Sequence, residues 1–120
     1  MIKLSLDEAY CFDYLSILET KCIKKNEQNI ELNNNKINCI YEIMNQIGTE
    51  LYDKIINSSE YKELFNINYK LFSIIDEVKK GGVDATSIDN LNYFRFLAKK
   101  KIQEKFFGTK VREIKLGYEE

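Results

Sequence analysis

Carboxylates at helical spacing are the residues of this sequence that could hold a metal ion. Glu50 and Asp53 lie three residues apart, as do Glu60 and Glu63, so each pair would share one face of a helix. Such carboxylates can bind Mg²⁺ and activate a water molecule, which makes a Mg²⁺-dependent hydrolase one alternative function. Lysines lie next to both pairs, and we favour solvated helix faces instead. Asp13 is expected to pair with a lysine of the last predicted helix.

Histidine is absent from the sequence. Its absence removes the commonest general base, the commonest transition-metal ligand and every Ser-His or Cys-His nucleophile pair. No glycine-rich phosphate loop is present, and the isolated Gly81-Gly82 pair is better explained as the end of a helix. We therefore expect no catalytic residue, no cofactor site and no metal site, which indicates a non-enzymatic protein.

The three cysteines are expected to be free thiols. On one helix, Cys11 and Cys22 would lie about 16 Å apart, given a rise of about 1.5 Å per residue. That distance is too long for a disulfide. Their spacing is close to three helical turns, so both are expected on one buried stripe, where reduced thiols pack as small hydrophobes.

Residues 91–109, LNYFRFLAKKKIQEKFFGT, mix aromatic rings with cations. Between residues 95 and 115, cations outnumber carboxylates by eight to two. A basic surface attracts phosphates, and exposed rings stack on bases, so nucleic-acid binding through this helix and the tail is the first alternative function. The net charge of −1 and the scarcity of arginine disfavour it. The candidate basic patch comprises Arg95, Lys99, Lys100, Lys101, Lys105, Lys110 and Arg112.

The same segment carries two apolar arcs, at about 100° per residue. One arc comprises Leu91, Phe94, Ala98 and Ile102, which predicts that Phe94 lies in the core. The polar residues Arg95, Lys99 and Gln103 fall between the arcs. A surface helix needs one apolar face, so the second arc requires cover from the tail, a ligand or another subunit. We favour a homo-oligomer, most simply a dimer. The candidate interface on the second arc comprises Tyr93, Phe96, Leu97 and Phe107.

Apolar residues at steps of three and four predict an all-α fold, a single domain resembling a four-helix bundle. The expected helices span about 6–25, 28–57, 60–80 and 87–107, followed by an irregular or strand-like tail over 108–120. Ser5, Ser58 or Ser59, and Thr86 are the expected helix caps. The expected buried row of the first helix includes Cys11, Tyr14, Leu15, Leu18 and Cys22.

The sequence also predicts a cytoplasmic protein with no membrane contact. No run approaches the roughly 20 apolar residues that span a bilayer, and the N-terminus becomes acidic too early for a signal peptide. Lysine, isoleucine and asparagine, whose codons are AT-rich, are abundant, which favours a bacterial or phage source. The favoured function is therefore a small structural or protein-interaction protein that self-associates.

Overall fold

The computed structural model describes residues 2, 5–25, 29–79, 81 and 85–109, and every regular element among them is helical. The all-α prediction is confirmed for these residues. Residues 110–120, most of the predicted tail, lie outside them. The helices are α1 (Glu8–Lys24), α2 (Ile30–Ile47), α3 (Thr49–Ile56), α4 (Ser59–Lys79) and α5 (Ala85–Phe107).

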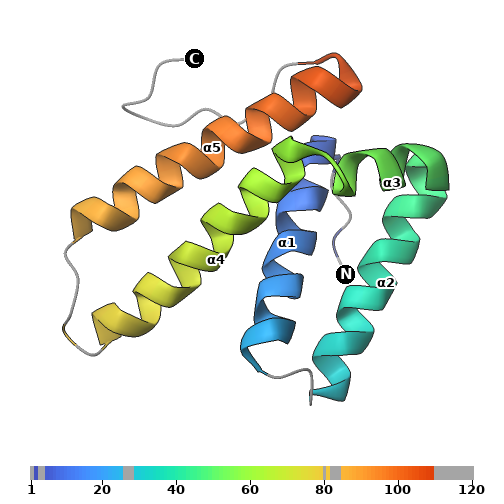
Figure 1. Cartoon of the computed structure of the whole chain (residues 1–120). Coiled ribbons are helices and arrows are strands. Elements are labelled where there is room, and N and C mark those ends of the chain that lie inside the picture. Colours follow the sequence, from blue (N-terminus) through green and yellow to red (C-terminus); the bar gives the residue numbers. More distant parts are fainter. Residues whose placement is uncertain (1, 3–4, 26–28, 80, 82–84, 110–120) are drawn as a thin grey trace.

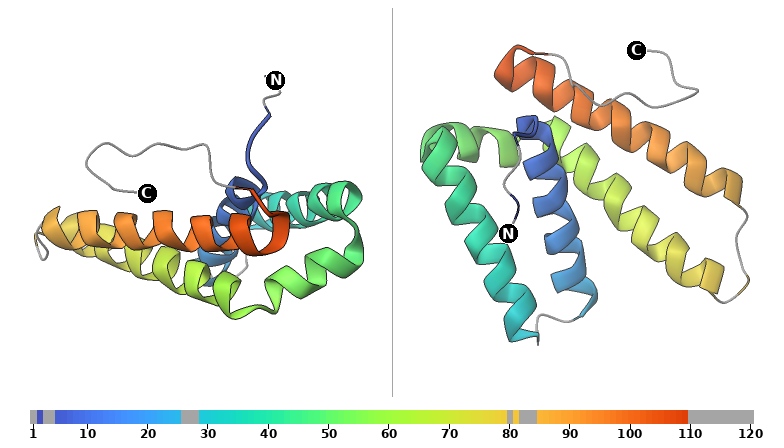
Figure 2. Two further views of the ribbon diagram at one scale, coloured as in Figure 1. Left: turned by 90° about the horizontal axis from the view of Figure 1, so that it is seen from above. Right: turned by 180° about the vertical axis from the view of Figure 1, so that it is seen from behind.

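The long helices form two antiparallel pairs, α1 with α2 and α4 with α5, and α3 connects the pairs at one end (Figure 1). Helix α1 is central, because it packs against α2, α4 and α5. Helix α2 packs mainly against α1 and α3. The two pairs are inclined to each other, as Figures 1 and 2 show, so the predicted four-helix bundle is not confirmed.

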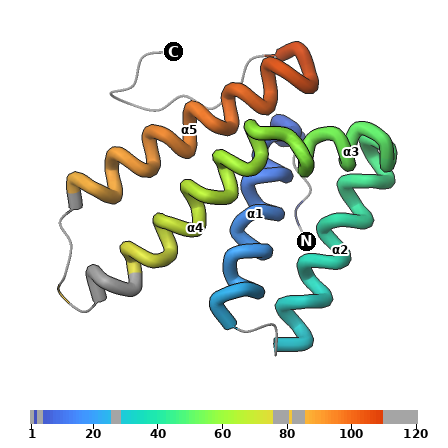
Figure 3. The backbone as a smooth tube through the Cα atoms, viewed as in Figure 1, coloured from blue at the N-terminus to red at the C-terminus, as the bar shows by residue number. Residues whose placement is uncertain are grey.

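A single glycine divides the predicted helix 28–57 into α2 and α3. Gly48 has φ 88° and ψ 153°, a conformation that is essentially restricted to glycine. Its N–H donates to the Met44 carbonyl at 2.8 Å, and its carbonyl accepts from the Tyr52 N–H at 3.1 Å. Gly48 thus ends one helix and starts the next, and the chain turns there (Figure 3). The prediction of one continuous helix is wrong.

The helix starts were predicted with mixed success. The Ser58 hydroxyl accepts from the Tyr61 N–H at 3.1 Å, so the predicted cap of α4 is confirmed. Ser5 is not a cap, because α1 begins at Glu8, after Asp7. Thr86 lies inside the first turn of α5 rather than before it.

Aromatic and aliphatic side chains of α1, α3, α4 and α5 make the core. The Phe12 ring is 6.4 Å from Tyr52, 6.2 Å from Tyr61 and 6.4 Å from Phe107, measured between ring centroids. Helix α2 contributes one buried side chain, Ile43, and four partly buried ones that pack against the core, Cys39, Ile40, Met44 and Ile47. It is therefore an edge helix with much of its surface in solvent.

The predicted buried row of α1 is only partly right. Leu15, Leu18 and Cys22 are buried, but Cys11 and Tyr14 are exposed. The buried face instead includes polar residues, which an apolar pattern does not report. The buried polar residues here are Asp7, which directly precedes α1, and Asp13, Ser16 and Thr20 within it.

Candidate functional site

Helix α5 directs a polar stripe, Arg95, Lys99 and Gln103, towards α1. We call these residues the inward stripe. The sequence placed them between two apolar arcs, whereas Lys99 and Gln103 are buried. Helix α1 makes this possible, because it offers a carboxylate, an aromatic ring and a free backbone N–H to the three side chains.

Arg95 of α5 and Asp13 of α1 form a forked ion pair. Arg95 Nε donates to Asp13 Oδ1 at 2.9 Å, and Arg95 Nη2 donates to Asp13 Oδ2 at 2.5 Å. Asn68 of α4 donates to Asp13 Oδ1 at 2.9 Å and to the Ser16 hydroxyl at 2.6 Å. Asp13 therefore does pair with α5, through Arg95 instead of the predicted lysine, and the polar cluster ties together α1, α4 and α5.

Gln103 supplies the missing N-terminal cap of α1. Its side-chain oxygen accepts from the Ala9 N–H at 2.9 Å, and its amide nitrogen donates to Glu8 Oε1 at 3.0 Å and to Thr109 Oγ1 at 2.8 Å. The first turn of a helix leaves backbone N–H groups unsatisfied, and capping normally comes from a nearby residue. Here the cap comes from the opposite end of the chain, so no local motif predicted it.

Lys99 is also held within the fold. Its ammonium group lies 4.5 Å from the centroid of the Tyr10 ring, within the range of a cation–π contact, and the residue is 5% exposed. Together with Arg95, it belongs to the predicted basic patch. These two cations therefore stabilise the α1–α5 contact and are poorly placed to meet a phosphate.

Two further cations of the patch neutralise the predicted carboxylate pair of α4. Lys105 Nζ is 2.8 Å from Glu60 Oε1, and Lys101 Nζ is 3.4 Å from Glu63 Oε2. The Lys105 contact lowers the pKa of Glu60. Lys110 and Arg112 lie outside the described residues, and Lys100 is half-buried. Among the described residues, no group of three acidic, cysteine or histidine side chains is arranged to hold a metal ion.

The aromatic residues of α5 are arranged differently from the prediction. Phe94, expected in the core, is 51% exposed. Phe96, expected at a subunit interface, is 1% exposed within the single chain. Tyr93 and Leu97 are half-buried, and Phe107 packs against the core. The candidate interface therefore lacks an accessible central ring. Ala98 and Ile102 of the first apolar arc are buried in the core as predicted, and Leu91 packs against it, so Phe94 is the exception in that arc.

A groove between α1 and α2 contains two of the three cysteines. Its volume is about 520 Å³, and Cys11, Cys39, Tyr14 and Glu42 are among its lining residues. Desolvation raises the pKa of the Cys39 thiol to about 11, with further contributions from Cys11 and Glu42. Desolvation and then Glu8 also raise the pKa of Cys11. Both thiols are therefore protonated at neutral pH, which argues against a nucleophilic role.

Glu19 is a half-buried carboxylate beside two buried tyrosines. The Tyr61 hydroxyl donates to Glu19 Oε1 at 2.9 Å. Desolvation raises the pKa of Glu19, and the Tyr61 hydrogen bond and the Lys36 charge partly offset this effect. Burial and then the Glu19 charge raise the pKa of Tyr52 to about 12, and they also raise the pKa of Tyr61. This cluster is packed into the core and offers no open site.

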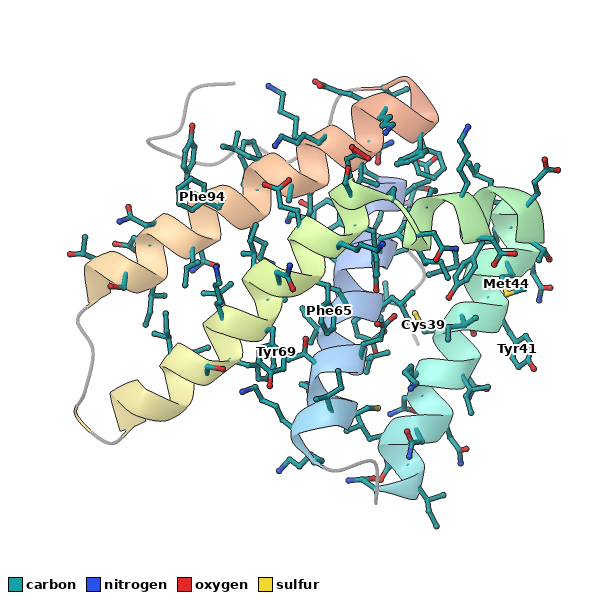
Figure 4. All side chains as sticks on the ribbon, viewed as in Figure 1. Cys39, Tyr41, Met44, Phe65, Tyr69 and Phe94 are labelled. Carbon is teal, nitrogen blue, oxygen red and sulfur yellow. The ribbon has the colours of Figure 1, made fainter. Side chains whose placement is uncertain are left out.

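The solvent side of α2 carries an apolar stripe. Figure 4 shows Tyr41 pointing away from α1, whereas Cys39 points towards it. Ile30 is 77% exposed, Ile37 44% and Tyr41 61%. Ile30 and Ile37 lie seven residues apart and Tyr41 follows four residues later, which is the spacing of a coiled-coil seam. Met44, further along α2, is half-buried and packs against the core. We call Ile30, Ile37 and Tyr41 the outer stripe of α2.

A second groove of about 520 Å³ lies between α4 and α5. Lys62, Asn66 and Lys70 line it from α4, and Leu91 and Phe94 line it from α5. Lys62 and Lys70 are exposed, and no ion pair is found for either within the described part of the chain. This groove thus combines unpaired positive charge with an exposed ring.

Within the described helices, none has the length and apolar character needed to cross a membrane. Comparison of the chain with protein-family models, with curated proteins and with solved structures finds no match in any of the three.

Proposed function

We propose that this protein is a non-enzymatic structural protein that self-associates through the outer stripe of α2. The observation that carries the proposal is the exposure of Ile30, Ile37 and Tyr41, at steps of seven and four residues, on a helix that packs on one side only. An amphipathic helix with a free apolar stripe is the usual element of helix–helix association. The original candidate interface on α5 is replaced, because Phe96 is buried within the chain.

A second copy of the chain is the occupant that best fits the outer stripe. The residues beside the stripe are mainly asparagines, Asn33, Asn34 and Asn45. Side-chain amides both donate and accept hydrogen bonds, so such a border is complementary to itself. The stripe itself contains no charged residue, so two copies placed together meet no like-charge repulsion. Aromatic residues such as Tyr41 are enriched at interfaces.

The test is to place a charge in the middle of the stripe. We expect Ile37→Glu to weaken association by at least about tenfold, roughly 1.4 kcal/mol, because a carboxylate would be buried without a partner. Sedimentation velocity over a range of protein concentrations measures the association. Circular dichroism should show unchanged helix content, because Ile37 is 44% exposed.

Ile23→Glu is a matched control, since Ile23 is 46% exposed and lies on α1. The control should associate like the wild type. A wild-type chain that sediments as a monomer at high concentration would refute the proposal. Equal loss of association in both variants would place the interface elsewhere.

A further inference from the structure

The groove between α4 and α5 has the charge expected of a site for an anionic ligand. Glu63, which lines it, has its charge offset by Lys101 at 3.4 Å. Lys62 and Lys70 also line it, and no ion pair is found for them among the described residues. The groove therefore has an excess of positive charge, although the whole chain carries −1. The relevant cations come from α4 and not from the predicted basic patch of α5.

The spacing of these cations indicates a ligand with more than one phosphate. Lys62, Asn66 and Lys70 follow one another at steps of four residues, so they line the same side of α4. Lys62 and Lys70 lie about 12 Å apart along the helix axis, at about 1.5 Å per residue. A chain of phosphates can follow this side of α4 and place a separate phosphate at each ammonium group. Asn66, between them, can donate to a phosphate.

The opposite side of the groove offers a surface for a planar ring. Phe94 is 51% exposed, although it is a large apolar residue, and Leu91 lies one helical turn before it. Bases of single-stranded nucleic acids stack on exposed aromatic rings, whereas a duplex hides the faces of its bases. Figure 4 labels Phe94 on α5.

We propose that the α4–α5 groove binds single-stranded nucleic acid, with Lys62 and Lys70 contacting phosphates and Phe94 stacking on a base. The site differs from the outer stripe of α2 and does not depend on self-association. Binding is expected to be non-specific in sequence, because two lysines and one ring read no base edge.

The absence of tryptophan from the chain allows a direct test. Phe94→Trp preserves stacking and places the sole tryptophan in the groove. A single-stranded oligothymidylate of twelve nucleotides should quench its fluorescence at low salt, and a duplex of the same length should quench it much less. Phe94→Ala should weaken binding of the fluorescein-labelled single strand about tenfold, within the range measured for the loss of one stacked base.

The proposed phosphate contacts of Lys62 and Lys70 are tested with a separate double variant and its own controls. Lys62→Gln with Lys70→Gln should reduce the dependence of log affinity on log salt by about 1.4, because each contact with a single-strand phosphate contributes about 0.7. Lys54→Gln and Tyr14→Ala remove an exposed cation and an exposed ring outside the groove and should bind like the wild type. The proposal is overturned if Phe94→Ala binds normally, if polyglutamate quenches the tryptophan as strongly as the oligonucleotide, or if no binding occurs at low salt.

Discussion

At the scale of single residues, Glu19 should make stability depend on pH. Its pKa is raised in the folded state, so the folded protein retains a proton that the unfolded chain releases. This contribution to stability is fully present below the unfolded pKa and is lost as pH rises through the folded pKa. Glu19→Gln keeps an oxygen for the Tyr61 hydroxyl but cannot ionise.

We therefore expect Glu19→Gln to be more stable than the wild type at pH 7 and to lose that advantage towards pH 4. Urea unfolding followed by circular dichroism at several pH values measures the difference. Glu104→Gln, at an exposed position of α5, should show no comparable pH-dependent gain. If Glu19→Gln is instead destabilised equally at every pH, the carboxylate stabilises the fold and its desolvation does not lower stability at pH 7.

The sequence predicted that Asp13 pairs with a cation of the last helix, and the structure shows that this cation is Arg95. It could not identify the inward stripe, because polar residues on a helix are ordinarily assigned to solvent. Burial of Lys99 and Gln103 depends on what α1 presents to them, namely the Tyr10 ring and the Ala9 N–H. Those groups become neighbours only through tertiary packing.

At the scale of elements, Gly48 should be intolerant of any side chain. A Cβ atom at this position would meet no atom within 4 Å, so crowding is not the obstacle. The obstacle is the backbone, because non-glycine residues in this conformation are strained by about 1–3 kcal/mol. We expect Gly48→Ala to lower the free energy of unfolding by that amount in urea titrations. Asn45→Ala, in the exposed last turn of α2, should change the free energy of unfolding little. A Gly48→Ala variant as stable as the wild type would contradict the backbone conformation assigned to Gly48.

The apolar spacing of residues 37–55 continues across Gly48, which is why periodicity alone predicted one long helix. Ile47 and Leu51 both pack against the core, one from α2 and the other from α3. A lone glycine inside a helical pattern is often tolerated, so its conformation cannot be read from the sequence. By contrast, the cap at Ser58 was predictable because a hydroxyl before an apolar run has one common local role.

At the scale of the whole molecule, the Asp13–Arg95 pair should behave as a coupled unit that holds three helices together. Asp13→Ala removes the acceptor for both Arg95 and Asn68. Breaking a buried ion pair typically costs about 3–5 kcal/mol, and the lower end applies here because the Arg95 side chain is 28% exposed.

A double-mutant cycle in urea measures the coupling. The combination of Asp13→Ala with Arg95→Ala should cost clearly less than the sum of the single variants, because the second substitution removes a charge that has already lost its partner. Additive losses would show that the two side chains stabilise the fold independently. The helical character of the chain was predictable from its apolar spacing, but the division at Gly48 and the inclined arrangement of the two helix pairs were not.

The cap that Gln103 places on α1 also constrains the order in which the chain can fold. The Ala9 N–H and the Gln103 side chain are separated by 94 residues in sequence, so their hydrogen bond closes a loop that includes most of the protein. Closing a long loop costs entropy before the contact is gained. During synthesis, the first turn of α1 therefore lacks its cap until α5 has been made and docked. Helix α1 is thus synthesised before α5, but its first turn is completed only after α5 has docked.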